Sequence, residues 1–338
     1  MLYEIPRVQH LTAQSVEEAA RWLREYGPRA RIIAGGTDLL GLMKDKIVGS
    51  KMPMPEVLID IKRIPGLDRI AYAEGRGLTI GAAATLRSME TSPVVLEKFP
   101  MLAQAANSVA TNQIRNMGTL GGNLCQRPWC WYFRVPHFDC YKKGGAMCYA
   151  ITGDNKYYFS VLGLGVCVMA HPSDTAPALI ALGASAKIIG PEEARTVPLE
   201  QFFNGPREVF ETVLKDDEVL TEVFVPEPPT NMYGVYVKER PRHTWDFALS
   251  SVAALTRLAN GFCEEARIIL GGVAPYPYRA QRAEEVLKGS PTTAEVAAEA
   301  GEAAVSGARP LSMNRYKIPL TRALVKRALL GCFGQTAR

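Results

Sequence analysis

Apolar runs broken by glycine or proline organise the first part of the chain. Ser15 and Glu18 form a capping-box pattern, which predicts a helix that runs to about Tyr26 and ends at Gly27-Pro28. Further along, the same patterns predict buried strands at 30–34, 78–81 and 161–170, an apolar turn at 39–43, and helices at about 92–109 and 175–182. Helices and strands are therefore mixed through this region.

The last third of the chain carries a strand–turn–strand pattern. The segment 225–229 (Val-Pro-Glu-Pro-Pro) reads as a linker. Beyond it, strands are predicted at 233–238, 247–258 and 263–270, with Asn260-Gly261 as a hairpin turn, and helices at 293–305 and 320–330. Strands followed by packed helices predict an α+β lobe.

Residues 125 to 160 differ from the rest of the chain. They hold many aromatic residues among several cysteines, and no helical or alternating pattern runs through them. A long segment without periodicity needs something other than secondary structure to organise it.

Composition narrows the class of protein. A chain of 338 residues is long enough for two or three lobes, and the net charge of +5 is spread along it, which disfavours nucleic-acid binding. No apolar run reaches the roughly 18 residues that span a bilayer. The first residues lack the basic and apolar regions of a signal peptide, so we expect a cytoplasmic protein, or one exported only with a partner subunit.

Two glycine-rich loops are candidates for binding phosphate. The segments 34–38 (Ala-Gly-Gly-Thr-Asp) and 119–123 (Thr-Leu-Gly-Gly-Asn) offer consecutive backbone N–H groups without side chains in the way. Two such loops suit the pyrophosphate of a dinucleotide, although either could be an ordinary tight turn. We expect Gly35 and Gly121 to be the positions at which an added side chain would exclude phosphate oxygens while the chain stays folded.

Five of the seven cysteines, Cys125 to Cys167, lie close together in the sequence, which favours a metal or cluster site over disulfides in a reducing compartment. The proposed ligands are Cys130, Cys140, Cys148 and Cys167. Four thiolates suit a [4Fe–4S] cluster, and zinc would accept the same four, with His137 and His171 as alternative ligands. Their spacing matches neither a ferredoxin run nor a zinc ribbon.

The order of these motifs resembles a known family. Residues 32–38 are similar to the first FAD loop of the medium, flavoprotein subunit of the xanthine dehydrogenase and carbon monoxide dehydrogenase family, which are molybdenum hydroxylases. Residues 114–123 (Ile-Arg-Asn-Met-Gly-Thr-Leu-Gly-Gly-Asn) resemble its second loop, residues 171–174 its acidic turn, and residues 236–238 the start of its C-terminal lobe.

The resemblance implies an α+β fold in two parts. The first is a two-lobed FAD-binding domain of the PCMH type, like that of vanillyl-alcohol oxidase, over 1–226, with lobes at about 1–60 and 61–226. The second is an α+β flavoprotein domain over 230–338, with an antiparallel sheet and helices. A cysteine-rich insert at about 125–167 would interrupt the first domain.

The resemblance also implies the residues that bind the flavin. Asp174 would bind a cofactor hydroxyl, Lys238 would lie near the isoalloxazine, and Leu220 would pack on a ring. The full implied FAD set is Ile33, Ala34, Gly35, Gly36, Thr37, Asp38, Leu39, Leu40, Thr111, Asn112, Gly118, Thr119, Gly121, Gly122, Asn123, Asp174, Leu220 and Lys238. No residue set for catalysis by this chain alone is implied.

The insert resembles that of the flavin subunits of 4-hydroxybenzoyl-CoA reductase and of bacterial aldehyde oxidoreductases, which carry an extra [4Fe–4S] cluster. This implies an electron-transfer subunit whose partners are a molybdenum-cofactor large subunit and a [2Fe–2S] small subunit. NAD, a quinone or ferredoxin could be its external redox partner. Two other classes stay open: a stand-alone FAD oxidoreductase of the related fold, and a zinc-stabilised module without redox function.

Overall fold

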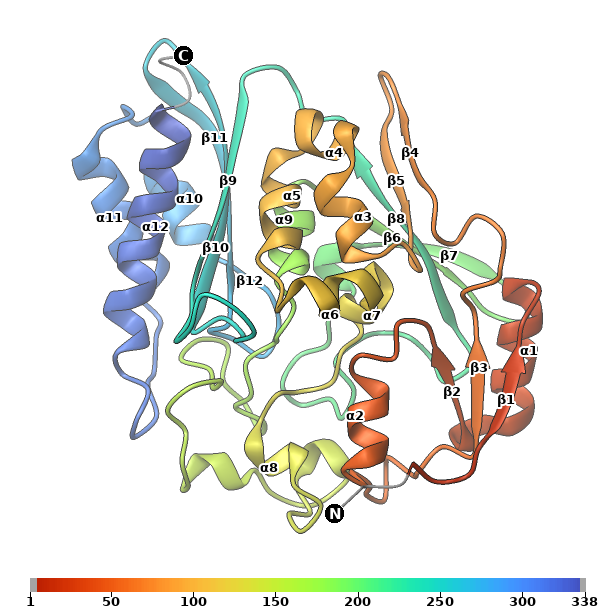
Figure 1. The fold of residues 1–338 in the computed structure, drawn as a ribbon. Coiled ribbons are helices and arrows are strands. Elements are labelled where there is room, and N and C mark those ends of the chain that lie inside the picture. Colours follow the sequence, from red (N-terminus) through yellow and green to blue (C-terminus); the bar gives the residue numbers. More distant parts are fainter. Residues whose placement is uncertain (1–4, 335–338) are drawn as a thin grey trace.

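The computed structural model describes residues 5–334; residues 1–4 and 335–338, where the expected domains begin and end, lie outside the described residues. The first lobe is built on a three-stranded parallel sheet in the order β1-β3-β2 (Figure 1). Its elements are β1 (Gln9–Thr12), α1 (Val16–Tyr26), the 3₁₀ turn η1 (Gly27–Arg29), β2 (Ala30–Ile33), α2 (Leu39–Lys44) and β3 (Val57–Asp60).

Helix α1 begins and ends where the sequence predicts. The Ser15 hydroxyl accepts a hydrogen bond from the backbone N–H of Glu18 at 3.1 Å, and Gly27 follows the last helical residue with a positive φ of 54°. The Glu18 carboxylate accepts from the N–H of Gln14 rather than from that of Ser15. The predicted helix is confirmed, with the return half of the capping box shifted by one residue.

The second lobe is a five-stranded antiparallel sheet in the order β4-β5-β8-β6-β7 with helices beside it. Its strands are β4 (Ile70–Ala73), β5 (Gly77–Gly81), β6 (Ser185–Ile189), β7 (Ala194–Pro198) and β8 (Val219–Pro226). Its helices are α3 (Leu86–Thr91), α4 (Pro93–Lys98), α5 (Pro100–Asn107), α6 (Asn112–Met117), α7 (Leu120–Leu124), α9 (Thr175–Ala181) and the 3₁₀ turn η4 (Leu199–Gln201). The single helix predicted at 92–109 is wrong, because Pro100 forces Phe99 out of helical geometry between α4 and α5.

The C-terminal lobe is a four-stranded antiparallel sheet in the order β12-β11-β10-β9, and it confirms the predicted hairpin. Its elements are β9 (Met232–Glu239), β10 (Ser250–Ala259), β11 (Phe262–Gly271), β12 (Tyr278–Arg279), α10 (Gln281–Leu287), α11 (Ala294–Ala304) and α12 (Lys317–Phe333). Asn260 and Gly261 both have positive φ, as a tight hairpin requires. None of the helices within residues 5–334 combines the length and apolarity that crossing a bilayer demands.

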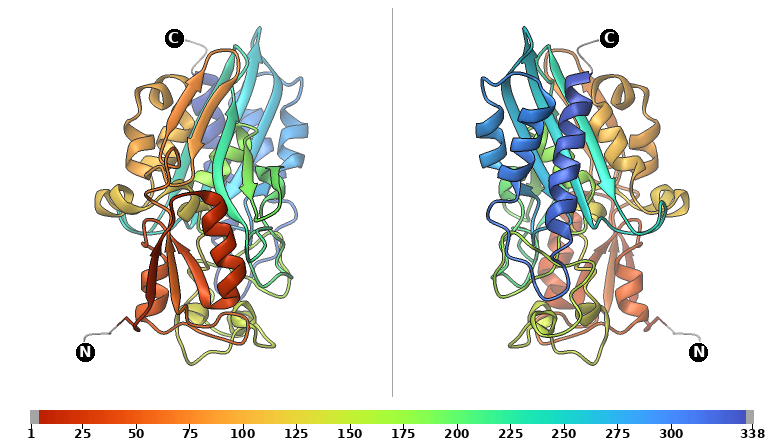
Figure 2. Two further views of the ribbon diagram at one scale, coloured as in Figure 1. Left: turned by 90° about the vertical axis from the view of Figure 1, so that its right-hand side faces the viewer. Right: turned by 90° about the vertical axis from the view of Figure 1, so that its left-hand side faces the viewer.

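Helices cover both faces of this last sheet (Figure 2). Val252 and Ala254 point into a core shared with α10, α11 and α12. Ala253 and Leu255, on the opposite face, belong to the large core that contains α5 and α9. The C-terminal lobe is therefore packed directly on the helices of the second lobe.

The cysteine-rich insert contains little regular structure, as its sequence indicates. It holds only α8 (Trp131–Arg134) and the 3₁₀ turns η2 (Tyr141–Lys143) and η3 (Tyr149–Ile151). The strand predicted at 161–170 is wrong: the segment has one isolated bridge, between Phe159 and Met169, and Gly163 turns the chain with a φ of +59°. The insert forms the yellow-green lower part of the molecule, beside α2 (Figure 1).

Candidate functional site

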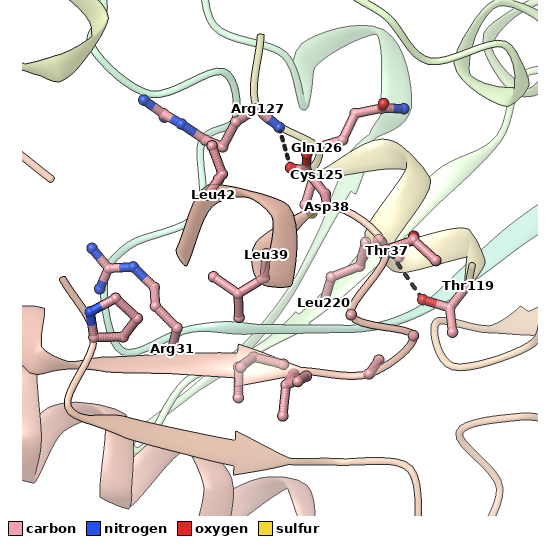
Figure 3. A pocket seen from close by; sticks show the side chains of 18 of the residues that line it. Arg31, Thr37, Asp38, Leu39, Leu42, Thr119, Cys125, Gln126, Arg127 and Leu220 are labelled. Carbon is pink, nitrogen blue, oxygen red and sulfur yellow. Dashed lines mark hydrogen bonds between the residues drawn. The ribbon is translucent and has the colours of Figure 1, made fainter. Parts of the chain in front are cut away.

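A cavity of about 340 Å³ lies between the loop after β2 and the N-terminal end of α7 (Figure 3). That volume is in the range of sites for small molecules and cofactors. It brings together predicted FAD residues from both glycine loops and from β8, namely Ile33, Ala34, Gly35, Gly36, Thr37, Asp38, Leu39, Thr119, Gly121, Gly122 and Leu220.

The first glycine loop offers unused hydrogen-bond donors to this cavity. Within residues 5–334, no backbone group accepts a hydrogen bond from the N–H groups of Gly35, Gly36 or Thr37. The cations Arg31 and Arg127 also line the cavity. Free backbone N–H groups beside cations favour an anionic ligand, such as a pyrophosphate.

The second glycine loop is held by its own hydrogen bonds. The N–H of Leu120 donates to Ala84 O at 2.9 Å and that of Gly121 to Ala82 O at 2.8 Å, while the N–H of Gly122 donates to Thr119 Oγ1 at 3.1 Å. This loop therefore shapes the cavity wall, and its N–H groups are already engaged.

Gly35 and Gly121 line the cavity, but the expectation that both could carry a side chain without loss of the fold is wrong for Gly35. A Cβ on Gly35 would lie 2.0 Å from Met117 O, and one on Gly121 would lie 3.0 Å from Ala82 O. Both glycines are needed because backbone segments touch there, so a side chain at Gly35 would disrupt the fold. Gly122 is different, because a Cβ there meets only Thr119 Oγ1, at 3.1 Å.

The other predicted FAD residues lie outside the lining of this cavity. Thr111 and Asn112 line a separate polar cavity of about 520 Å³. Asn123 joins the second loop to α9, because its Oδ1 accepts from the hydroxyls of Ser173 at 2.7 Å and Thr175 at 2.6 Å. Their contact with FAD stays a prediction, as does that of Leu40, Gly118, Asp174 and Lys238.

Asp174 and Lys238 form a buried ion pair. Lys238 Nζ lies 2.7 Å from Asp174 Oδ2, and both side chains are 3% exposed. Asp174 Oδ1 accepts a hydrogen bond from the Tyr236 hydroxyl at 2.8 Å, and Lys238 also donates to Ser108 O at 3.0 Å. Burial lowers the pKa of Lys238, whereas Asp174 favours its charged form. The pair joins the N-terminal end of α9 to β9.

Removing one partner of this pair should destabilise the fold. We expect Lys238→Met to lower the free energy of unfolding by about 3–5 kcal/mol, because it leaves the Asp174 carboxylate buried without a cation. Urea unfolding of the apoprotein measures this, with Lys288→Met as the control because Lys288 is exposed. Equal unfolding midpoints for the two variants would contradict the importance of the pair.

The four predicted cysteine ligands converge. Cys130, Cys140 and Cys167 are buried in one core cluster, and Cys148 packs against it. The interaction between the thiols of Cys148 and Cys167 lowers the pKa of Cys148 and raises that of Cys167. Cys125 instead lines the 340 Å³ cavity, and burial raises its pKa to about 12.

Backbone N–H groups and a buried cation surround these thiols. Burial raises the pKa of Cys130 and Cys140, and hydrogen bonds from nearby backbone N–H groups oppose that rise. The N–H groups of Phe133, Lys143 and Ile151 donate to the carbonyl oxygens of Cys130, Cys140 and Cys148, at 3.1, 2.8 and 3.4 Å. The fully buried Lys143 ammonium donates to Val135 O at 2.9 Å, and its charge favours the Cys140 thiolate.

In the described part of the chain, no three His, Cys, Asp or Glu side chains are placed to hold one metal ion. His137 is exposed. His171 is buried, accepts a hydrogen bond from the N–H of Ser173 and packs edge-on against Phe203, and burial lowers its pKa to about 3. The Nε2 atom of His171 is buried and has no hydrogen-bond partner among the described residues.

Two family models match the chain one after the other. The model described as FAD binding domain in molybdopterin dehydrogenase covers residues 6–228, and the CO dehydrogenase flavoprotein C-terminal domain covers residues 235–332. The chain belongs to the FAD-binding medium subunits of the molybdenum hydroxylase family. This medium subunit is therefore the flavoprotein component of an oxidoreductase, and the predicted family and fold are confirmed.

Individual relatives agree with this assignment. The aldehyde oxidoreductase FAD-binding subunit PaoB of Escherichia coli (strain K12) is 34% identical over 87% of this chain and 89% of PaoB. The carbon monoxide dehydrogenase medium chain of Hydrogenophaga pseudoflava is 31% identical over 98% and 99% of the two chains. A solved carbon monoxide dehydrogenase from the same organism superposes with a TM-score of 0.78 at 30% identity, covering 98% of this chain and 99% of that one.

Several residues that line the cavity were not predicted from the sequence. They are Arg31, Ile32, Leu42, Met43, Ile47, Met52, Pro53, Met54, Pro55, Ile61, Ala82, Cys125, Gln126, Arg127, Phe210, Leu214, Glu218 and Val219. Two features of the sequence could have pointed to some of these cavity residues. Arg31 is a charged residue within an apolar strand, and the segment 52–55 alternates methionine with proline without any helical or strand pattern.

Proposed function

We propose that this medium subunit carries a [4Fe–4S] cluster beside its FAD and passes electrons between the iron–sulfur centres of partner subunits and an external acceptor or donor. The observation that carries the proposal is the convergence of Cys130, Cys140, Cys148 and Cys167 in one buried core. When bound, the flavin supplies redox chemistry that accepts electrons singly or in pairs.

The cavity residues suit the FAD that the family binds. The free N–H groups of the first glycine loop and the guanidinium of Arg31 would hold the pyrophosphate, and the wall formed by Leu220 would pack against a ring. We assign the FAD site to the eleven predicted residues that line this cavity. These residues bind and orient the cofactor.

The four thiols suit a cluster. Each iron of a [4Fe–4S] cluster takes one thiolate, so four thiols are needed in one neighbourhood. Cys130, Cys140 and Cys167 share one buried core, and Cys148 packs against it. Backbone N–H donors and the Lys143 ammonium would offset the negative charge of the cluster.

The names of several relatives indicate a multi-subunit enzyme. PaoB is called an FAD-binding subunit, and other relatives are called medium chains or medium subunits. We infer that this chain works with a large subunit that holds the molybdenum cofactor and a small [2Fe–2S] subunit, in a complex of the aldehyde oxidoreductase or aromatic acyl-CoA reductase type. The domains would divide in the segment between the end of β8 at Pro226 and the start of β9 at Met232.

An activity comparison tests the electron-transfer role. We expect the purified chain alone to oxidise no aldehyde, purine or thioester, because that chemistry would take place at the molybdenum centre of another subunit. Added to its partner subunits, it should restore electron transfer from substrate to an acceptor, measured as flavin bleaching. Substrate turnover by the isolated chain without molybdenum would refute the role.

A further inference from the structure

The flavin cavity and the cysteine core share one wall. Leu42 of α2, Ile47 and Met52 line the 340 Å³ cavity and also belong to the core cluster that contains the thiols. A packed core transmits displacement, because its side chains leave little free space. A shift of these three side chains would therefore alter both sites.

Asp38, at the start of α2, is held by the insert. Its Oδ2 accepts a hydrogen bond from the backbone N–H of Arg127 at 2.9 Å (Figure 3). Its Oδ1 lies 2.6 Å from Arg134 Nη2, and the Arg134 guanidinium stacks 4.3 Å from the ring centre of Trp129. The Asp38 side chain accepts no capping hydrogen bond from the first backbone N–H groups of α2. Its carboxylate is thus committed to the insert.

A chain of buried charges continues from Arg127 toward the cysteines. Arg127 Nη1 lies 2.7 Å from Glu211 Oε2, and Lys142 Nζ lies 3.1 Å from Glu211 Oε1. Arg127 Nη2 also donates to Lys142 O at 2.8 Å. Glu211 and Lys142 have side chains only 2% and 3% exposed, so solvent screens this contact weakly. Lys142 stands two residues after Cys140.

The segment after α2 holds the insert at a second place. The N–H of Lys51 donates to Lys143 O at 3.0 Å, and the Ser50 hydroxyl donates to Gly144 O at 3.2 Å. A Cβ on Gly49 would lie 2.3 Å from Lys143 O, so only glycine permits this approach. Ile47 and Met52, two of the shared wall residues, flank these contacts.

We propose that the FAD site and the cysteine site form as one coupled unit, in which Arg134 is a positioning residue that holds Asp38 of the FAD site. An occupied cysteine site holds α2 and the first glycine loop in the geometry that FAD needs. Coupling between two binding sites is reciprocal, so bound FAD should in turn raise the affinity of the cysteine site for its cluster. This inference rests on the cluster assigned under the proposed function.

The test uses Arg134→Gln, because Arg134 does not line the flavin cavity. In the assembled complex we expect this variant to bind FAD about tenfold more weakly, within the usual range of coupling between sites. Asp38→Asn should weaken FAD binding as well, and the double variant should be no worse than Asp38→Asn alone. The controls are Arg21→Gln and Asp45→Asn, which change exposed residues on α1 and just after α2. FAD dissociation constants come from flavin fluorescence.

Iron release provides a second, independent readout. We count only the iron in excess of that of the [2Fe–2S] subunit. At equilibrium we expect a ferrous chelator to remove several-fold more of it from FAD-stripped than from FAD-loaded complex, and from Arg134→Gln than from Arg21→Gln. If Arg134→Gln had full iron content and unchanged FAD affinity, the proposed coupling would be wrong, while the cluster assignment would still stand. A wild-type complex with no iron beyond that of its [2Fe–2S] subunit would overturn the cluster assignment, and the coupling with it.

Discussion

Gly122→Leu should abolish stable FAD binding while the protein stays folded. A Cβ at Gly122 meets no backbone atom outside its own helix within 4 Å, so the new side chain extends into the cavity that Gly122 lines. Forcing a ligand against such a side chain costs about 3 kcal/mol, which is roughly a hundredfold in Kd. FAD content after purification and the Kd from fluorescence quenching measure the effect.

Two other glycines serve as comparisons. Gly205 is exposed, and a Cβ added there would meet no atom within 4 Å, so Gly205→Leu should bind FAD normally. The Gly35→Leu variant should either not fold at all or have a lower melting temperature than the wild type, since its Cβ would overlap Met117 O. Normal FAD content in Gly122→Leu would show that the flavin does not use this cavity.

Serine in place of Cys130, Cys140, Cys148 or Cys167 should remove most of the iron. Each of these thiols belongs to or packs on the same core, and a [4Fe–4S] cluster needs all four thiolates. A metal centre supplies folding free energy to a segment without regular structure, so the insert should also become sensitive to proteolysis. Iron analysis and limited proteolysis of each variant measure both effects.

Cys125→Ser is the matched control for this series. Cys125 is the nearest cysteine in sequence to Cys130, but it lines the flavin cavity and shares no core with the other four. This variant should keep about four iron atoms per chain. If Cys125→Ser lost its iron and one of the other variants kept it, the ligand set would be wrong.

Much of the fold follows from local patterns in the sequence. Ser15 and Gly27 fix both ends of α1, and Asn260-Gly261 fixes the hairpin between β10 and β11. The division of one predicted helix at Pro100 is a local signal that the single-helix prediction overlooked. Local patterns fail where distant contacts decide the geometry: in the segment 161–170, the N–H of Val161 donates to Val273 O and that of Cys167 to Pro206 O, and no strand forms.

The site was harder to derive than the fold. Glycine identity marks both loops, but it does not reveal that Gly35 faces Met117 while Gly122 faces the cavity. Cysteine spacing gives no recognised ligand pattern, and only the folded insert shows which thiols meet. Arg134 and Asp38 are 96 positions apart, and no periodicity connects them. Such contacts depend on tertiary packing.

The central claim is that one chain holds both a flavin and an iron–sulfur cluster. Metal analysis of the purified wild-type chain, with FAD measured in the same sample, tests it most directly. We predict about four iron atoms per FAD, together with a brown absorbance shoulder beside the flavin bands. FAD without iron, or zinc in place of iron, would contradict the account.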